Sequence, residues 1–278
     1  MSGSNDLSAF GAHAPKGMVA RMLGWTRSAG HGWLARRKAF IFRKLAIKLL
    51  AGAPLDVETM GAKMRLYPYN NVSEKRILFT PQYFDEPERM LLAERMGENF
   101  VFIDIGANVG GYTLFAAAQA KPGTRILAIE PQPEIFERLI FNIRQNEFAN
   151  VKAIDCAVAD KDGDIILFLD RDNRGETSMR IVGPEGAGSS IRAPAKTLMR
   201  IVAEEGFDHI DAVKLDVEGA EDLILEPFFR TAPQALWPKL IMMEHLHQRW
   251  VVDLRQLLME KGYREVQKTK NNTAWERG

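Results

Sequence analysis

From residue 86 onward, short apolar runs alternate with segments in which apolar residues recur every three or four positions. The short runs predict buried strands at residues 100–107 ("FVFIDIGA"), 125–131 ("RILAIEP"), 151–160 ("VKAIDCAVAD"), 211–217 ("DAVKLDV") and 239–246 ("KLIMMEHL"). The helical spacing predicts helices at residues 86–96, 111–120, 133–146, 196–206 and 220–229. This alternation is typical of an α/β fold with a doubly wound, mostly parallel sheet covered on both faces.

Two further segments interrupt or end this pattern. After the turn "DKDG", the segment "GDIILFLDR" is typical of a hairpin, and "VGPEGAGSS" is typical of an exposed loop. The last 26 residues predict a helix and then an antiparallel β-hairpin that turns at Asn271-Asn272.

The N-terminal part differs from the rest in charge. The whole chain has 37 basic and 36 acidic residues, and its net charge of +1 argues against nucleic acid as the main partner. Residues 7–55, however, contain no acid, and their basic residues are Lys16, Arg21, Arg27, Arg36, Arg37, Lys38, Arg43, Lys44 and Lys48. Within this segment, residues 33–52 ("WLARRKAFIFRKLAIKLLAG") have the spacing of a basic amphipathic helix.

We therefore divide the chain into a basic N-terminal leader and helix, residues 1–55, and an α/β domain, residues 56–278. The helix has two interpretations: it packs on its own domain or on a second subunit, or it lies on an anionic membrane surface. No stretch approaches the roughly 20 apolar residues of a membrane span. Residues 1–20 predict a flexible leader and not a secretion signal. The single cysteine, Cys156, fits a reducing, cytoplasmic compartment and a small buried side chain.

A glycine-rich turn follows the first predicted strand. Gly106, Gly110 and Gly111 permit positive φ and close approach of the main chain, and the following helix presents free N–H groups. The spacing G-x-x-x-G-G differs from the G-x-G-x-x-G of dinucleotide folds. A turn of this kind also occurs as a plain connection between a strand and a helix. The residues at the ends of the neighbouring strands therefore decide whether it indicates a ligand site.

Acids follow the neighbouring strands. Glu130 ends the second strand, where a carboxylate can accept hydrogen bonds from both ribose hydroxyls. Asp155 ends the third, beside the expected place of an adenine ring. With the glycine turn, these acids indicate an adenosyl ligand without a pyrophosphate. Asp104, inside the first strand, is costly to bury unless it anchors the glycine turn or faces a cation, and S-adenosylmethionine carries a sulfonium and an ammonium group.

Four motifs carry a family resemblance: "FIDIGANVGGYT", "IEPQPEIFERLIFNI", "AVADKDG" and "VKLDVEGAE". Together they resemble FkbM-type S-adenosylmethionine-dependent methyltransferases over residues 83–265. The resemblance implies a class I, Rossmann-like fold with a seven-stranded sheet and methyl transfer to a hydroxyl of a sugar, glycolipid or secondary metabolite. One departure is Met199, which replaces an acid that usually precedes a helix in the family.

Carried over position by position, the resemblance assigns the cofactor site. Asp104, Gly106, Asn108 and Gly110 would hold the methionine part of the cofactor. Glu130 would bind the ribose, and Asp155 and Ala157 would lie beside the adenine.

The fourth and fifth strands supply candidates for catalysis. Lys214, Asp216 and Glu218 alternate along one strand and share a face if the strand continues that far. Methyl transfer to a hydroxyl is helped by a general base that removes the hydroxyl proton. We predict Asp216 as this base, with His245 as the second candidate. Lys214 either acts on the substrate or pairs with an acid. Asp216, Glu218 and Glu244 also form a candidate Mg²⁺ site that would hold a diol acceptor.

The sequence also contains candidates for recognition of the acceptor and is compatible with other functions. The segment 170–190 offers polar groups for an acceptor, namely Asn173, Arg174, Thr177 and Ser178, or forms a solvent-facing turn. A nucleotide-dependent oxidoreductase and a non-catalytic, membrane-associated scaffold that binds an adenosyl group are the alternatives. Oligomerisation is compatible with all three.

Overall fold

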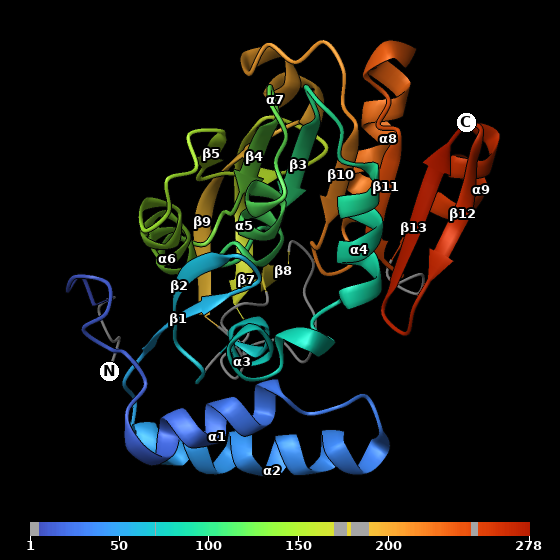
Figure 1. Ribbon diagram of the computed structural model, residues 1–278. Helices are drawn as coiled ribbons and strands as arrows, with labels where there is room; N and C mark the ends of the chain where they lie inside the picture. Colours follow the sequence, from blue (N-terminus) through green and yellow to red (C-terminus); the bar gives the residue numbers. More distant parts are fainter. Residues whose placement is uncertain (1–5, 70, 170–176, 179–188, 246–249) are drawn as a thin grey trace.

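The computed structural model describes residues 6–69, 71–169, 177–178, 189–245 and 250–278 (Figure 1). Its central sheet has seven strands in the order β12-β13-β11-β10-β3-β4-β5. These are β3 (Val101–Ile105), β4 (Arg125–Ile129), β5 (Val151–Ile154), β10 (Ala212–Leu215), β11 (Leu240–Glu244), β12 (Tyr263–Lys268) and β13 (Asn272–Arg277). Strands β5, β4, β3, β10 and β11 run parallel, and β13 is antiparallel to both β11 and β12. The predicted doubly wound sheet with a C-terminal antiparallel hairpin is confirmed.

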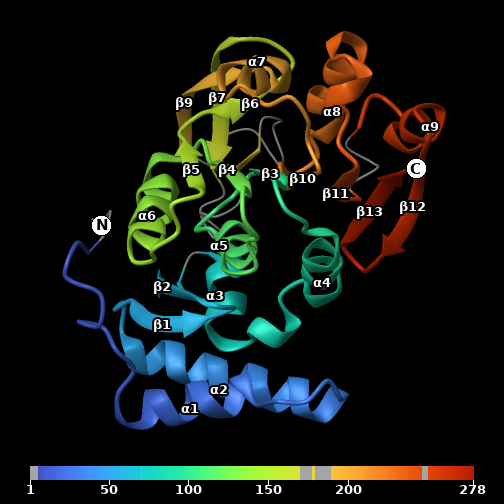
Figure 2. The ribbon, with the colours of Figure 1, turned by 45° about the horizontal axis from the view of Figure 1, so that its top comes forward.

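Helices cover both faces of the sheet (Figure 2). One layer contains α4 (Glu86–Arg95), α5 (Gly111–Ala118) and α6 (Pro133–Arg144), and the other α7 (Leu198–Glu204), α8 (Glu221–Thr231) and α9 (Leu254–Glu260). Strand β3 shows why: Phe102 packs in the core with α4 and α5, whereas Ile103 packs in the core with α7, α8 and α9. Successive side chains of a strand point to opposite faces, so a strand buried on both sides is mostly apolar, and Asp104 is the exception in β3.

The chain order creates a topological switch point between β3 and β10. From β3 the chain proceeds through β4 to β5, and it then returns to add β10 on the other side of β3. In such sheets the loops on either side of the switch point leave in opposite directions and open a crevice at the carboxyl ends of the strands. A ligand site is therefore expected beside Ile105 and Leu215, the last residues of β3 and β10.

A second sheet corrects the prediction of one continuous strand at 151–160. β5 ends at Ile154, and β6 (Ala157–Val158) joins β7 (Gly163–Leu169), β8 (Thr177–Ser178) and β9 (Ser189–Lys196) in the order β6-β9-β7-β8. Apolar residues precede and follow the break, because Ala157 and Val158 are buried in the second sheet. Apolar character therefore could not reveal the break. The hairpin predicted after "DKDG" is confirmed by the antiparallel pairing of β7 and β9.

The N-terminal part forms a layer at one end of the molecule (Figure 1). It comprises α1 (Gly17–Arg27), α2 (Trp33–Leu50), the hairpin β1 (Leu55–Thr59) and β2 (Ala62–Leu66), α3 (Val72–Phe79) and the short helix η1 (Pro81–Tyr83). The predicted amphipathic helix is α2. Helices α1 and α3 and the β1–β2 hairpin were not predicted.

The prediction of a flexible leader is wrong from Asp6 onward. The Arg65 side chain is 1% exposed, and its guanidinium donates to the carbonyls of Asp6, Ser8 and Ala9. It also donates to both oxygens of Asp56, at 2.6 and 2.8 Å. A buried guanidinium needs acceptors for all its donors, and the leader supplies three of them. These bonds join residues 6–9 to the β1–β2 hairpin across the predicted boundary at residue 55.

Candidate functional site

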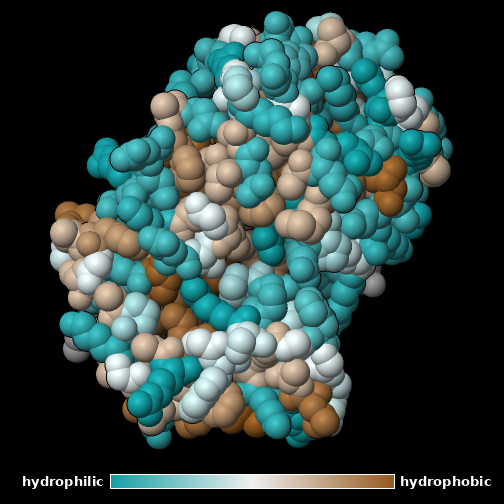
Figure 3. All heavy atoms as spheres, viewed as in Figure 1, coloured by the Kyte–Doolittle hydropathy of each residue, from teal (hydrophilic) through white to brown (hydrophobic). Residues whose placement is uncertain are grey.

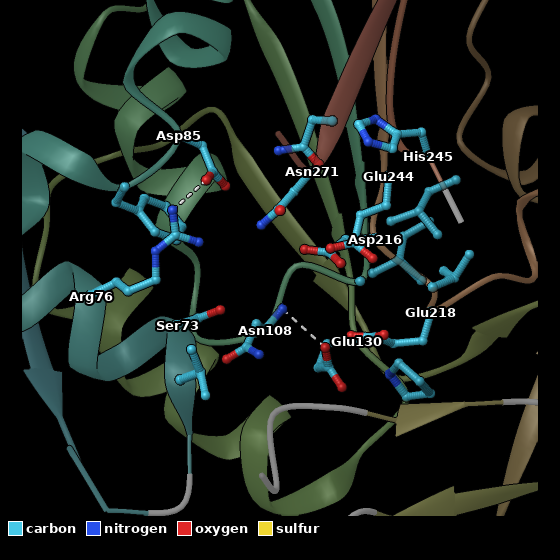
Figure 4. Close-up of a pocket in the computed structure, with 18 of the residues that line it drawn as sticks. Ser73, Arg76, Asp85, Asn108, Glu130, Asp216, Glu218, Glu244, His245 and Asn271 are labelled. Atoms are coloured by element: carbon cyan, nitrogen blue, oxygen red, sulfur yellow. Dashed lines mark hydrogen bonds and ion pairs between the residues drawn. The ribbon is translucent and has the colours of Figure 1, made fainter. Parts of the chain in front are cut away.

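A cavity of about 500 Å³ lies at the carboxyl ends of β3, β4, β10 and β11 (Figure 4). Seven of the residues predicted for the site line it, namely Gly106, Asn108, Glu130, Asp216, Glu218, Glu244 and His245. In the close-up, Asn108 and Glu130 lie on one side of the hollow, Asp216, Glu218 and Glu244 on a second, and Arg76 and Asp85 on a third. The switch point thus brings these predicted cofactor-binding, catalytic and metal-binding residues to one cavity.

Gly106 holds the two sides of the switch point together. Its φ is +76°, and a Cβ added there would lie 2.1 Å from the backbone oxygen of Asp216. The Asp216 N–H in turn donates to the Ile105 carbonyl at 3.0 Å. Only a residue without a side chain permits this approach and this φ.

Asn108 connects the glycine turn to α3 and to Glu130, which follows β4. Its φ is +51°, and its side-chain oxygen accepts from the Asn71 amide at 2.7 Å. The Asn108 N–H donates to Glu130 at 2.9 Å. Asn71 also caps α3 by accepting from the Glu74 N–H. The turn is therefore held from both sides.

Glu130 is buried, yet it faces the cavity. One carboxyl oxygen accepts from the Asn108 N–H and the other from the Gln132 N–H. Burial raises the pKa of Glu130 to about 7, against the opposing effect of these two hydrogen bonds. Each oxygen keeps a second lone pair, so the carboxylate form can accept two hydroxyls from a ligand in the cavity.

Asp104 and Gly110 lie behind the cavity wall and do not line it. Asp104 is fully buried and accepts from the Thr113 hydroxyl at 2.6 Å, so it joins β3 to α5. Burial raises the pKa of Asp104, although the nearby Lys214 opposes this. Gly110 has a φ of +94° at the start of α5 and packs against Leu139. Both residues therefore support the glycine turn from the side that faces away from the cavity.

Lys214 pairs with Asp216, as one of its two predicted roles requires. Its ammonium nitrogen is 2.9 Å from an Asp216 oxygen, and its side chain is 9% exposed. Burial alone lowers the pKa of Lys214, but attraction by Asp216 and Asp104 outweighs it and holds the pKa above its usual range. A permanent cation beside Asp216 orients this carboxylate and cannot itself accept a proton.

Asp216, Glu218 and Glu244 offer carboxylate oxygens that lie within 4.8 Å of one another. They do not meet along one strand face, because β10 ends at Leu215. Instead, positive φ values at Glu218 (+54°) and Gly219 (+91°) turn the chain back toward the cavity. A non-glycine residue in this conformation is strained and is commonly found at functional sites.

The residues that follow β5 do not lie where the prediction for the adenine region placed them. Asp155 is exposed, and Ala157 is buried in the second sheet, so neither lines the cavity. Between them, Cys156 does line it, and burial raises the pKa of this thiol to about 11. Cys156 is thus a neutral, small side chain, as predicted.

Sequence reasoning missed one wall of the cavity. Arg76 of α3 is 2.6 Å from Asp85, at the start of α4, and its neighbour Ser73 also faces the cavity. The turn between β12 and β13 adds Lys270 and Asn271. The capping pattern N-x-x-E at 71–74 could have revealed α3.

Two other predictions of the sequence have different outcomes. Asn173 and Arg174 lie outside the described residues, and the side chains of Thr177 and Ser178 are not described. Met199, which replaces the usual acid, leaves α7 capped, because the Thr197 hydroxyl accepts from the Arg200 N–H at 3.2 Å.

Comparison with known proteins identifies the family. The methyltransferase FkbM domain matches residues 104–265. The chain is 27% identical over 156 residues to methyltransferase sdnD of Sordaria araneosa, covering 46% of this chain and 60% of that protein. It is 29% identical over 168 residues to the 31-O-demethyl-FK506 methyltransferase FkbM of Streptomyces tacrolimicus, covering 50% of this chain and 62% of that protein. The matches thus span less than two thirds of either relative.

The chain also aligns with solved structures at low sequence identity. A precorrin-6y C5,15-methyltransferase from Geobacter metallireducens GS-15 aligns with a TM-score of 0.42 and 14% identity, covering 75% of this chain and 95% of that one. TYW2 of M. jannaschii, in complex with AdoMet, aligns with a TM-score of 0.40 and 17% identity, covering 82% and 88%. The FkbM domain spans more than half of the chain and favours a methyltransferase over the oxidoreductase alternative. The chain belongs to the FkbM family of S-adenosylmethionine-dependent methyltransferases.

Proposed function

We propose that this protein transfers a methyl group from S-adenosylmethionine to a hydroxyl of a sugar, glycolipid or secondary metabolite. The observation that carries the proposal is the position of Asp216, which faces the cavity beside Gly106 and is paired with the buried Lys214. The relative named as a 31-O-demethyl-FK506 methyltransferase supports an oxygen acceptor.

The cavity offers chemically distinct places for the parts of the cofactor. Glu130 would accept the ribose hydroxyls, and the apolar surfaces of Ile129, Pro131 and Cys156 would lie against the adenine. Gly106 and Asn108 would hold the methionine part through their backbone. Asp104 and Gly110 would act by supporting that turn.

The chemistry requires a nucleophilic oxygen aligned with an electrophilic carbon. S-adenosylmethionine supplies the electrophilic methyl group on its sulfonium sulfur. Asp216 accepts the proton of the acceptor hydroxyl, which in enzymes contributes about 10²–10⁴-fold. Lys214 keeps this carboxylate oriented, and His245 is the second candidate base. Ser73, Arg76 and Asn271 line the same cavity and provide hydrogen-bonding groups that align the acceptor.

Mass spectrometry of a deletion strain tests this function. We expect a metabolite or glycan that is lighter by one methylene unit than in the parent strain and that regains this mass on complementation. A mass profile identical to that of the parent would contradict the proposed reaction.

The pKa of Glu130 predicts that cofactor binding depends on pH. Its carboxylate form accepts the ribose hydroxyls, so below the pKa of about 7 a proton must be lost on binding. Affinity for S-adenosylhomocysteine should therefore be constant above about pH 8 and fall roughly tenfold per unit below pH 7. Calorimetry between pH 5.5 and pH 8.5 measures this dependence.

Glu130→Gln is the matched variant for this measurement. It keeps the shape of the side chain but loses the titration, so its affinity should be lower at pH 8 and nearly constant with pH. Glu74, whose pKa burial also raises to about 7, remains in this variant and controls for a general effect of folding. If Glu130→Gln keeps the full pH dependence, Glu130 does not bind the ribose.

We also propose that Asp216, Glu218 and Glu244 bind Mg²⁺. Three carboxylates with oxygens within 4.8 Å of one another form the hard oxygen donor set that this ion prefers. The ion would lower the pKa of an acceptor hydroxyl that binds to it.

Removal of the metal should lower turnover roughly tenfold or more, with recovery on addition of Mg²⁺. Glu218→Gly is the informative variant, because it relieves the backbone strain while removing one ligand. It should raise the Mg²⁺ concentration needed for half-maximal turnover without lowering the melting temperature. Full activity in excess EDTA would exclude the metal.

A further inference from the structure

Helices α1 and α2 expose large apolar side chains to solvent. The two helices form the outermost layer at one end of the molecule (Figures 1 and 2). Their inner positions are filled, as the buried Ala39 and Ala46 of α2 show. Side chains that are 41–67% exposed are Met18, Trp25, Trp33, Leu34, Phe40, Ile41, Leu45 and Leu49. We call this surface the outer face.

Every charged residue on these two helices is basic. Residues 7–55 contain no acid, and the exposed cations of the two helices are Arg21, Arg36, Arg37, Lys38, Lys44 and Lys48. Apolar and basic side chains are intermixed: the Arg37 guanidinium lies 5.3 Å from the centre of the Trp33 ring. Figure 3 shows brown apolar and teal hydrophilic atoms side by side along this edge. Helices that lie in a membrane interface have this composition.

Charge decides between the partners that would cover the outer face. A second copy of this face would place basic residues against basic residues, without a single acid from residues 7–55 to compensate. A bilayer with anionic headgroups matches the basic side chains and receives the tryptophan and leucine side chains. Among the described residues, no helix is long and apolar enough to cross a membrane.

We propose that the outer face of α1 and α2 docks the protein on an anionic lipid surface. The helices lie in the plane of the interface, with their apolar side chains at the headgroup boundary and with Arg37, Lys44 and Lys48 against lipid phosphates. The layer is fixed to the catalytic domain, since Arg27 of α1 donates to the Leu78 carbonyl of α3 at 2.9 Å. Ser73 and Arg76 of α3 line the cavity, so α3 connects the docked layer to the cavity.

Co-sedimentation of the full chain with vesicles tests the proposal. We compare phosphatidylcholine vesicles with vesicles that contain about 30 mol% phosphatidylglycerol. The bound fraction should be at least about tenfold greater on the anionic vesicles and should fall as salt rises from about 0.1 to 0.5 M. Equal, negligible binding to both kinds of vesicle would overturn the proposal.

Charge-reversal variants locate the surface. The triple variant Arg37→Glu, Lys44→Glu, Lys48→Glu should lose most of the binding. The control triple Lys121→Glu, Arg144→Glu, Arg264→Glu makes the same change in net charge at exposed sites elsewhere and should retain it. Melting temperatures of both variants verify folding. Equal losses in the two triples would indicate unspecific attraction and overturn the assignment to this face.

The apolar side chains supply an independent readout. Trp33→Ser with Leu45→Ser should weaken binding to anionic vesicles at both salt concentrations, because it removes the salt-independent part. Sedimentation velocity without lipid tests the rival occupant. A dimer that this double variant abolishes would show that the outer face pairs two copies, and it would overturn the lipid proposal.

Discussion

Gly106→Ala should abolish cofactor binding and lower the free energy of unfolding by at least about 2 kcal/mol. The added Cβ would lie 2.1 Å from the Asp216 backbone oxygen, and the φ of +76° is itself unfavourable for alanine. Because the contact is with backbone, β3 and β10 must separate at the switch point to relieve it. Chemical denaturation and calorimetry with S-adenosylhomocysteine measure the two effects.

The control variant Gly206→Ala separates the effect of an unfavourable φ from the effect of the close contact with Asp216. Gly206 has a similar φ of +61°, but no atom lies within 4 Å of an added Cβ. This variant should lose only about 1–2 kcal/mol and bind the cofactor normally. If Gly106→Ala loses no more stability than Gly206→Ala and still binds, the close approach at the switch point does not matter for the site.

Asp216→Asn should lower turnover by about 10²–10⁴-fold while changing affinity for S-adenosylhomocysteine by less than about threefold. The asparagine keeps the size of the side chain and loses the ability to accept the hydroxyl proton. Single-turnover kinetics with saturating cofactor isolates this step from binding. His245→Asn, tested in parallel, should have the smaller effect.

Asp155→Asn is the matched control for this substitution. Asp155 is an exposed acid directly after β5 and does not line the cavity, so turnover should stay within about twofold of wild type. Undiminished turnover in Asp216→Asn would exclude Asp216 as the base. A comparable loss in Asp155→Asn would show that the carboxylate effect is not specific to the cavity.

The sequence predicts those parts of the site that depend on chain order alone. Gly106, Glu130 and Asp216 each come directly after an apolar strand, and parallel strands bring their carboxyl ends to one edge of a sheet. The sequence alone is therefore enough to place these three residues at one site. The same reasoning failed at Asp155, because both sides of the break after Ile154 are apolar and the pattern does not show a change of sheet.

Contacts between distant segments could not be predicted in this way. Arg76 reaches the cavity because α3 packs across the carboxyl edge of the sheet, and no local pattern reports where a short helix packs. Arg65 is buried because the leader wraps around it, although a lone arginine in a sequence is typical of a surface. The amphipathic pattern of residues 33–52 predicted helix α2, because helical spacing is a local property, but it did not show which face of the helix would be exposed.

Transfer of a labelled methyl group tests the central claim most directly. Purified wild-type protein and Asp216→Asn are incubated with S-adenosylmethionine carrying a carbon-13 methyl group and with extract of the deletion strain, which contains the unmethylated acceptor. Wild type should produce a labelled O-methyl group, recognised by its carbon-13 chemical shift, and Asp216→Asn should produce almost none. Label on nitrogen, carbon or sulfur, or no labelled product with wild type, would contradict the account.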